Sequence, residues 1–402
     1  AMKWIVVFIL ASCSLVYSQP KKTFELVSKM DGIHFLDNND TTNIWGYSFY
    51  NSEGTPKPKL PSPTLVVNEG DSVHIIMYNT SGEGHTIHMH GLDADQANDG
   101  VPHLSYFVSP HVDTGNYRFV AKHAGNYMYH CHVTSTLHVT MGMYGVFIVK
   151  AQGGVNQVYT GGPTYTKEYI YFSSDMQKSW NDDYMSIGPF NKYKPDRFLI
   201  NGIEKNQLFQ DSSQVIQAQA GDTVLLRLIN LGYSAVKYEF PSQLNATFFT
   251  NDGRILNPTE KSDTLTLFPG ERTSALLYFN SSYSGYIKVH YHSLYQMKGI
   301  GFNEIGINLF SPSSINEQII STNNFKVFPN PTSGIININF QIDGNEKINI
   351  EAVLFDVSGK LVKTDRLFHQ KESLDYSNLT KGVYILKLTG RNFSETLKII
   401  KN

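Results

Sequence analysis

Residues 85–143 concentrate metal-binding side chains in a pattern that β-strands would sort onto two opposite faces. The segment opens with His85, His88 and His90 and closes with His130, Cys131, His132, His138 and Met143. Successive side chains of a strand point to opposite faces, so Cys131 faces away from the histidines on either side of it. By the same rule, His85 faces away from His88 and His90. The pattern therefore predicts two groups of donors, separated by one residue of backbone at Cys131.

The chemistry of these donors favours copper. Thiolate and thioether are soft ligands that suit copper, and imidazole suits it as well. His85 and Cys131 can share one copper, while His88, His90, His130 and His132 can share a second metal site behind it. A zinc site would not explain Cys131 and Met143 together.

These residues also carry a family resemblance. The segment from His85 to Gly91 resembles the HPxHLHG motif of multicopper oxidases, and the segment from His130 to Met143 resembles their closing HCH motif. The resemblance implies a type 1 copper on His85, Cys131, His138 and Met143. It implies type 2 or type 3 copper ligands at His88, His90, His130 and His132. His138 follows Cys131 by seven positions. This spacing is longer than the usual Cys-to-His spacing of laccases and shorter than that of the copper nitrite reductases.

Composition limits the classes of protein to consider. A chain of 402 residues suggests roughly two to three domains. The net charge of -2 argues against a nucleic-acid partner and against an anionic membrane surface. Only two cysteines are present, and Cys13 lies in a predicted leader, so a disulfide framework is excluded. A lone thiol in a secreted protein is a liability unless something such as a metal binds it.

The chain begins with a predicted export signal. Residues 1–18 carry Lys3 followed by an apolar run that is too short to span a membrane, as in a secretory signal peptide. The segment 10–13 also resembles a lipoprotein cleavage box, which is the alternative.

Residues 22–152 are predicted to form a β-sandwich. Short strand-like segments alternate with turns and show no helical period, and Asp99-Gly100 is a hairpin signal. By resemblance to multicopper oxidases this is a Greek-key cupredoxin domain with the copper sites.

Residues 165–312 repeat the plan after a Gly- and Thr-rich segment, 153–164, that we interpret as a linker. This part is similar to a second cupredoxin domain. Its only histidines are His290 and His292, which we predict to be metal ligands by family position. Tyr291 replaces the copper-binding cysteine, so no blue copper is expected here. The segment 233–240 stands where the family has its HxxHxH motif.

Residues 325–402 follow a second predicted linker, 313–324, and resemble the C-terminal sorting domain of type IX secretion in Bacteroidetes. The resemblance implies a small immunoglobulin-like β-sandwich, recognition by the type IX secretion machinery, and a secreted or cell-surface protein. An accessory immunoglobulin-like binding module is the alternative. The whole chain is thus expected to be all-β.

Three functions are compatible with these motifs. The first is a multicopper oxidase that passes electrons from a small-molecule or protein donor to dioxygen, with His88, His90, His130 and His132 as its catalytic site. The second is a nitrite-reductase-like enzyme that uses His90, His130 and His292. His88 argues against this interpretation, because that family has a proton-donating Asp at the position of His88. The third is a non-enzymatic electron-transfer or copper-binding protein. Two-domain relatives form head-to-tail trimers, which implies a homotrimer with His290 and His292 facing the neighbour's site.

Overall fold

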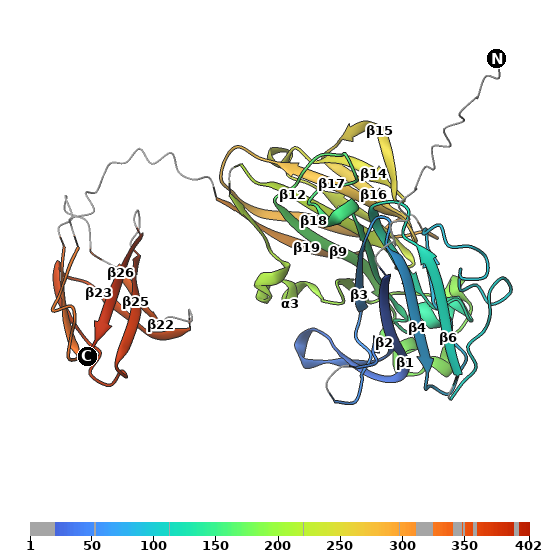
Figure 1. Ribbon diagram of the computed structural model, residues 1–402, viewed down its shortest axis with the longest axis horizontal. Coiled ribbons are helices and arrows are strands. Elements are labelled where there is room, and N and C mark those ends of the chain that lie inside the picture. Colours follow the sequence, from blue (N-terminus) through green and yellow to red (C-terminus); the bar gives the residue numbers. More distant parts are fainter. Residues whose placement is uncertain are drawn as a thin grey trace, which may run out of the picture. The chain divides into compact units, whose positions relative to one another are not determined.

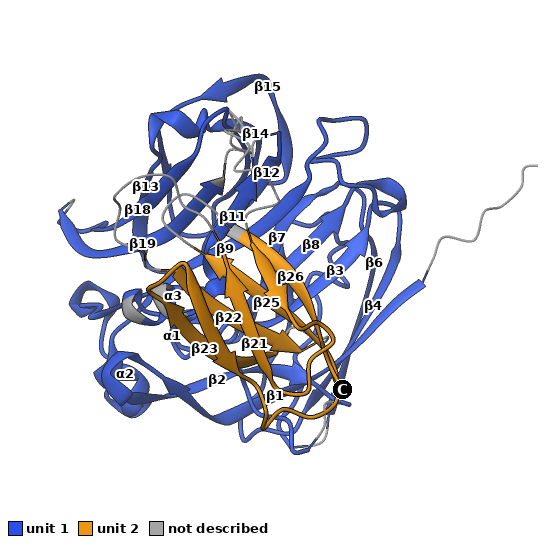
Figure 2. Cartoon of the chain, turned by 90° about the vertical axis from the view of Figure 1, so that its left-hand side faces the viewer, with its two compact units in different colours: residues 1–312 blue, residues 313–402 orange. Residues whose placement is uncertain are grey.

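The computed structural model describes residues 21–51, 54–111, 113–219, 221–296, 298–310, 325–340, 348, 350–356, 360–389 and 394–402. The predicted leader at 1–18 and the second predicted linker at 313–324 lie outside the described residues. Two compact units make up the chain, residues 1–312 and residues 313–402 (Figure 2).

The first unit opens with a β-sandwich (Figure 1). One sheet has the order β2-β1-β4-β6, with β2 Thr41–Phe49, β1 Lys21–Phe35, β4 Ser72–Asn79 and β6 Asp113–Val120. The other has the order β3-β8-β7-β5, with β3 Ser62–Asn68, β8 Tyr144–Lys150, β7 Gly125–His130 and β5 His88–His90. Alternation along the strands places Val73, Ile75 and Met77 of β4 in the core between the sheets. A short helix, α1 Ser135–Thr140, follows β7.

A second sandwich follows in the same unit. One sheet runs β10-β9-β12-β17-β14-β15, with β10 Arg197–Ile200, β9 Lys167–Met176, β12 Thr223–Asn230, β17 Arg272–Tyr278, β14 Thr247–Asn251 and β15 Arg254–Lys261. The facing sheet runs β11-β19-β18-β13-β16, with β11 Ile216–Gln219, β19 Gly299–Phe310, β18 Tyr283–Ser293, β13 Ser234–Glu239 and β16 Thr264–Leu267. Short helices connect the strands of this unit: α2 Lys178–Asp182, α3 Lys205–Gln210, and the 3₁₀ turns η1 Asp37–Asn39, η2 Gln152–Gly154, η3 Tyr184–Ser186, η4 Phe190–Lys192, η5 Ser212–Gln214 and η6 Ser242–Leu244.

The two sandwiches pack sheet against sheet. Met128, Val146 and Ile148 from the outer face of β7 and β8 contact a cluster that contains Phe172 and Ile229 of the second sandwich. The sheet that carries β5 and β7 therefore faces the sheet that carries β9 and β12. The remaining sheet of the second sandwich, which carries β13 and β18, lies on the far side of that sandwich.

Residues 153–164 connect β8 to β9 and are packed, because Val158 is fully buried against Leu225 and Leu276. One local prediction was wrong. The predicted hairpin at Asp99 is absent from the described residues. The carbonyl of Asp99 instead accepts hydrogen bonds from the backbone N–H of Met89 and from a ring nitrogen of His88, and these bonds tie this loop to β5.

The second unit is a smaller two-sheet structure. Its sheets run β20-β21-β24 and β23-β22-β25-β26, with β20 Lys326–Phe328, β21 Ile335–Asn339, β24 Lys371–Asp375, β23 Leu361–Leu367, β22 Ile350–Asp356, β25 Gly382–Thr389 and β26 Ser394–Lys401. Ile336, Leu354 and Leu386 are fully buried in the core between them. The expected all-β fold class is confirmed. Among the described residues, no helix has the length and apolar character that a membrane span requires.

One buried amide joins the two sandwiches of the first unit. Asn126, 1% exposed, donates from Nδ2 to the carbonyls of Leu228 (3.2 Å) and Thr273 (3.0 Å). Its Oδ1 accepts a hydrogen bond from the hydroxyl of Ser274 at 2.6 Å. A single side chain thus satisfies three polar groups inside an apolar interface.

We expect Asn126→Ala to lower the free energy of unfolding of the first unit by about 2–4 kcal/mol, because it leaves buried polar groups without partners. Denaturant unfolding followed by the fluorescence of Trp45 and Trp180 measures this. The control is Asn308→Ala, which removes one exposed hydrogen bond to Ser284 and should cost about 0.5 kcal/mol or less. Equal effects of the two substitutions would contradict the prediction.

Candidate metal centre

The structure brings Cys131, His85 and His138 together in the interior of the first sandwich. Cys131 directly follows β7, His85 precedes β5 and pairs with Val108, and His138 lies on α1. All three are fully buried. Their nearest donor atoms lie within 4.8 Å of one another. Strand alternation alone would not place His138, since it lies on a helical turn.

Both imidazoles present Nδ1 to the sulfur atom. Sγ of Cys131 lies 3.7 Å from Nδ1 of His85 and 3.1 Å from Nδ1 of His138. The two Nδ1 atoms are 3.3 Å apart. Nε2 of His138 lies 3.1 Å from a carboxylate oxygen of Glu83, so Nε2–H donates to that carboxylate and the lone pair of Nδ1 faces the sulfur.

Met143 lies beside this group. Its backbone carbonyl accepts a hydrogen bond from the N–H of Cys131, and its N–H donates to the carbonyl of His138, both at 3.0 Å. The side chain is fully buried in the same core cluster as Cys131. The backbone of Met143 is thus bonded to two of the three grouped ligands, and its side chain lies in the same core.

The other histidines gather on the opposite face of the same sheet. His88 and His90 lie on β5, and His88 is the register partner of His130 at the end of β7. Donor atoms of His88, His90 and His130 lie within 4.8 Å of one another. His132 lies beside them, with its ring 5.1 Å from that of His88 and 5.9 Å from that of His130.

Hydrogen bonds to carbonyls orient two of these rings. Nδ1–H of His88 donates to the carbonyl of Asp99 at 2.8 Å, and Nδ1–H of His130 donates to the carbonyl of Cys131 at 3.0 Å. In both rings Nε2 is then the nitrogen with a free lone pair. Nε2 of His130 lies 3.2 Å from Nδ1 of His90. Two ring nitrogens so placed can share a proton or a metal ion.

Burial keeps these imidazoles neutral and the thiol protonated. It lowers the pKa of His85 to about 3, with His138 adding to the effect, and lowers the pKa of His130 to about 3. Burial first and the charge of Arg272 second lower the pKa of His90 to about 4. Burial raises the pKa of the Cys131 thiol to about 11. A cation that binds here meets free imidazole lone pairs but must displace the thiol proton.

The second sandwich of the same chain reaches the histidine group through a turn rather than through its own histidines. A Cβ atom on Gly270, whose φ is +89°, would lie 3.3 Å from Nε2 of His90. A Cβ on Gly91 would lie only 1.9 Å from a guanidinium nitrogen of Arg272. The absence of side chains at both glycines lets this turn approach the site.

His290 and His292 lie elsewhere in the chain. Both are on β18, and Tyr291 between them is fully buried in the core of the second sandwich, where its hydroxyl donates to the carbonyl of Leu199. Alternation therefore points both histidines to the outer face of their sheet, away from the first sandwich. Among the described residues, no ring contact joins them to His88, His90, His130 or His132.

Sequence reasoning missed several residues that lie beside the predicted histidine ligands or act on them by charge. They are Glu83, the carbonyl of Asp99, Gly270 and Arg272, together with Lys237 and Glu239 beside His290. Each reaches its histidine through tertiary contact and has no spacing that marks it in the sequence. His103 is exposed and belongs to neither donor group.

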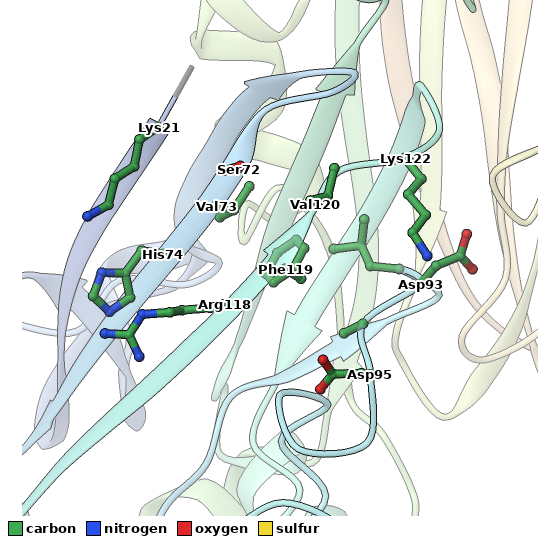
Figure 3. Close-up of a pocket in the computed structure, with 12 residues that line it drawn as sticks. Lys21, Ser72, Val73, His74, Asp93, Asp95, Arg118, Phe119, Val120 and Lys122 are labelled. Carbon is green, nitrogen blue, oxygen red and sulfur yellow. The ribbon is translucent and has the colours of Figure 1, made fainter. Parts of the chain in front are cut away.

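A separate surface cavity of about 890 Å³ lies between β4, β6 and the loop that follows His90. Figure 3 shows Lys21, His74 and Arg118 along one side of it and Asp93 and Lys122 along another. None of the predicted ligands lines this cavity. It is therefore distinct from both donor groups.

Family models match three segments of the chain. Residues 55–154 and 167–299 each match a multicopper oxidase model, and residues 326–402 match the model of a secretion system C-terminal sorting domain. The two multicopper oxidase matches fall on the two sandwiches of the first unit.

Individual relatives agree with these matches. Laccase-15 of Oryza sativa subsp. japonica is 27% identical over 243 residues, which is 56% of this chain and 38% of the laccase. The chain thus spans well under half the length of this relative. The structure of the blue copper oxidase from Nitrosomonas europaea has a TM-score of 0.58 at 27% identity, covering 72% of this chain and 86% of that one.

The copper nitrite reductase from Nitrosomonas europaea shares the fold alone, with a TM-score of 0.57 at 20% identity over 73% of this chain and 95% of that chain. The multicopper oxidase family binds copper, and its laccases are oxidoreductases. Since both sandwiches match models of this one family, which together span more than half of the 402 residues, the chain belongs to the multicopper oxidase family and carries a secretion system C-terminal sorting domain.

Proposed function

We propose that the protein is an exported copper oxidoreductase that takes electrons from a small-molecule or protein donor and delivers them to dioxygen. The observation that carries the proposal is the position of Cys131. It belongs to the buried sulfur-containing group, while its two neighbours in the chain belong to the histidine group on the opposite face. One residue of backbone therefore connects the two donor groups.

The residues present fit copper. The sulfur of Cys131 and the Nδ1 atoms of two imidazoles converge where all three side chains are fully buried, and Nε2 of His85 has no hydrogen-bond partner among the described residues. A soft sulfur with two imidazoles is the donor set of a blue copper site, to which Met143 would add a thioether sulfur. At the histidine group, nitrogen donors of His88, His90 and His130 converge, which suits copper that reacts with small molecules.

Bound copper would supply one-electron transfer at the Cys131 group and binding of dioxygen at the histidine group. The protein itself contributes orientation and exclusion of water. Glu83 holds the ring of His138, and the carbonyl of Asp99 holds the ring of His88. Full burial of His85, Cys131, His138 and Met143 keeps water away from the first group.

We further propose that the histidine group is completed by another copy of the chain in a head-to-tail homotrimer. His290 and His292 face outward from their sheet, on the side away from their own first sandwich. They cannot reach the histidine group of the same chain without unpacking the interface at Met128 and Ile229. A heterologous contact in a closed ring would bring the pair of one subunit to the group of the next.

A nitrite-reducing site is the second candidate. It would need three histidines around one copper, for which His90, His130 and a neighbour's His292 are the residues in position. The approach of Nδ1 of His90 to within 3.2 Å of Nε2 of His130 favours this choice of pair. His88 stands beside them, where a proton-donating Asp would be needed.

The C-terminal unit supports export. Residues 326–402 match a sorting domain of a secretion system. We propose that the type IX machinery recognises this unit, that a signal peptide at residues 1–18 directs the chain to it, and that the oxidoreductase works at the cell surface or outside the cell.

Replacing Cys131 tests the first copper group. We expect copper-loaded wild-type protein to show an intense visible absorption band from sulfur-to-copper charge transfer, and Cys131→Ser to lose the band completely while retaining β-sheet circular dichroism. Absorption and copper content should be measured on the same samples. A colourless wild type with full copper occupancy would rule out this group as a blue copper site.

Replacing His292 tests the histidine group. We expect His292→Ala to leave the visible band intact but to lower turnover by about 10–100-fold, because a ligand of the reacting copper is lost. Dioxygen uptake and nitrite consumption should be measured side by side with an artificial reductant. Uptake of dioxygen supports the oxidase, and nitric oxide formation supports the second candidate.

The matched control for that test is His123→Ala, since His123 is half exposed and belongs to neither donor group. It should leave both the band and turnover unchanged. If wild-type protein turns over neither substrate and His292→Ala changes nothing, the chain is an electron-transfer or copper-binding protein.

The buried imidazoles predict an acid-sensitive metal-free protein. The pKa of His85 is about 3 and that of His90 about 4 in the folded chain, whereas unfolded histidine has a pKa near its ordinary value of about 6.5. Below about pH 6.5 the unfolded chain binds more protons, so the free energy of unfolding falls as the pH falls, by at most about 1.4 kcal/mol per pH unit for each such histidine. Above that pH both states are neutral and this contribution is constant.

We therefore expect His85→Asn to make the metal-free protein less sensitive to acid between pH 6.5 and 4.5, as measured by denaturant unfolding. His123→Asn, at a half-exposed position, is the control and should leave the slope unchanged. An equal slope for His85→Asn and the wild type would contradict the prediction.

A further inference from the structure

We propose that Glu239 of the second sandwich is a metal ligand that acts together with His290 and His292. The inference rests on the proposed function, because the complete site would form where this face meets the histidine group of another subunit. It changes the expected donor set from imidazoles alone to imidazoles with one carboxylate.

Strand register identifies Glu239 as the counterpart of a ligand. In the first sandwich, His88 on β5 is opposite His130 on β7, and His90 is two residues further along β5. In the second sandwich, Lys237 on β13 is opposite His290 on β18, and Glu239 is two residues further along β13. The motif His130-Cys131-His132 matches His290-Tyr291-His292, so Lys237 and Glu239 occupy the positions of His88 and His90.

The contacts of Glu239 agree with this placement. Its Oε2 lies 3.3 Å from Nε2 of His290, at ion-pair distance, and that Nε2 has no other polar partner among the described residues. Nε2 of His292 is also buried and has no hydrogen-bond partner in the part of the chain that the structure describes, and the two rings are 6.4 Å apart. A carboxylate oxygen and two imidazole nitrogens on one sheet face can bind a cation together once any proton on those nitrogens has been released.

Lys237 fits the role of a positioning residue. Its ammonium lies 2.9 Å from Oε1 of Glu239, which leaves Oε2 as the oxygen that faces His290. An ammonium group has three donors and no lone pair, so Lys237 cannot replace the imidazole of its counterpart as a ligand. It can hold the carboxylate of Glu239, as outer-sphere partners of metal ligands do.

Mixed nitrogen and oxygen donors suit divalent copper. Imidazole binds copper well, and a tetragonal arrangement of nitrogen and oxygen ligands is typical of Cu(II). The second sandwich would thus contribute two nitrogens and one oxygen from a single outer sheet face. A second sandwich with histidines at positions 237 and 239 would contribute four imidazoles. This one contributes two imidazoles and one carboxylate, and the ammonium of Lys237 takes the place of the remaining imidazole.

The test is titration of the metal-free full chain with Cu²⁺ against a competing chelator, with copper counted per chain. We expect the wild type to bind copper beyond the single ion of the Cys131 group. Glu239→Gln should weaken this additional binding by about 10–100-fold while leaving the visible band of Cys131 unchanged. Glu239→His should restore it and add nitrogen hyperfine structure to the electron paramagnetic resonance spectrum of the additional copper.

The matched control is Glu304→Gln. Glu304 lies on the same sheet face, opposite Lys288, and pairs with Lys205 at 2.8 Å. The Glu304→Gln variant should bind the additional copper as tightly as the wild type does. Light scattering establishes whether each variant forms the same oligomer. If Glu239→Gln alters the assembly, recovery of binding in Glu239→His supports the ligand role, and failure of recovery overturns it.

The remaining outcomes separate the two proposals. Additional copper bound equally tightly by Glu239→Gln and the wild type overturns the ligand role of Glu239 and leaves the proposed function standing. If the wild type binds copper at the Cys131 group and nowhere else, no shared site exists. Both the proposed function and this inference are then overturned.

Discussion

The antiparallel pairing of β5 with β7 is the constraint on which both donor groups depend. It sets His88 opposite His130 and leaves Cys131 as the first residue beyond the strand. Because alternate residues point to opposite faces, the sulfur enters the sandwich core while its neighbours stay on the outer face. His85 and His138 then meet the sulfur from a bridge and a helical turn. A shift of one residue in this pairing would exchange the two faces and dismantle both groups.

Burial gives these groups their chemistry. Imidazoles and a thiol inside an apolar core are held in their uncharged forms, because ions are poorly solvated there. The cost is an interior that protons destabilise and that a metal cation would stabilise. Glu83 and the carbonyl of Asp99 each accept one ring N–H, so the opposite nitrogen of His138 and of His88 keeps its lone pair. Orientation therefore depends on residues outside the histidine motifs.

The same strand pairing recurs in the second sandwich with different residues. Tyr291 fills the core position of the cysteine, and Lys237 with Glu239 fills the positions of two histidines. The two sandwiches pack through the sheets that carry β7 and β12, so the outer face with His290 is left on the far side. The two sandwiches thus carry related sets of side chains on sheet faces that do not face each other. This geometry is the physical argument for a site shared between copies.

The sequence by itself determined the all-β class, the division of the donors between two faces, and the repeated plan of the two sandwiches. It could do so because alternation along a strand is local and has a period of two residues. Only the tertiary structure decided that residues 153–164 are packed, and that Asp99 anchors β5 rather than turning a hairpin. It also decided that Glu83 and Glu239 contact histidines and that the charge of Arg272 acts on His90. These contacts join residues from separate strands and loops, and no periodic pattern along the chain encodes which of them meet.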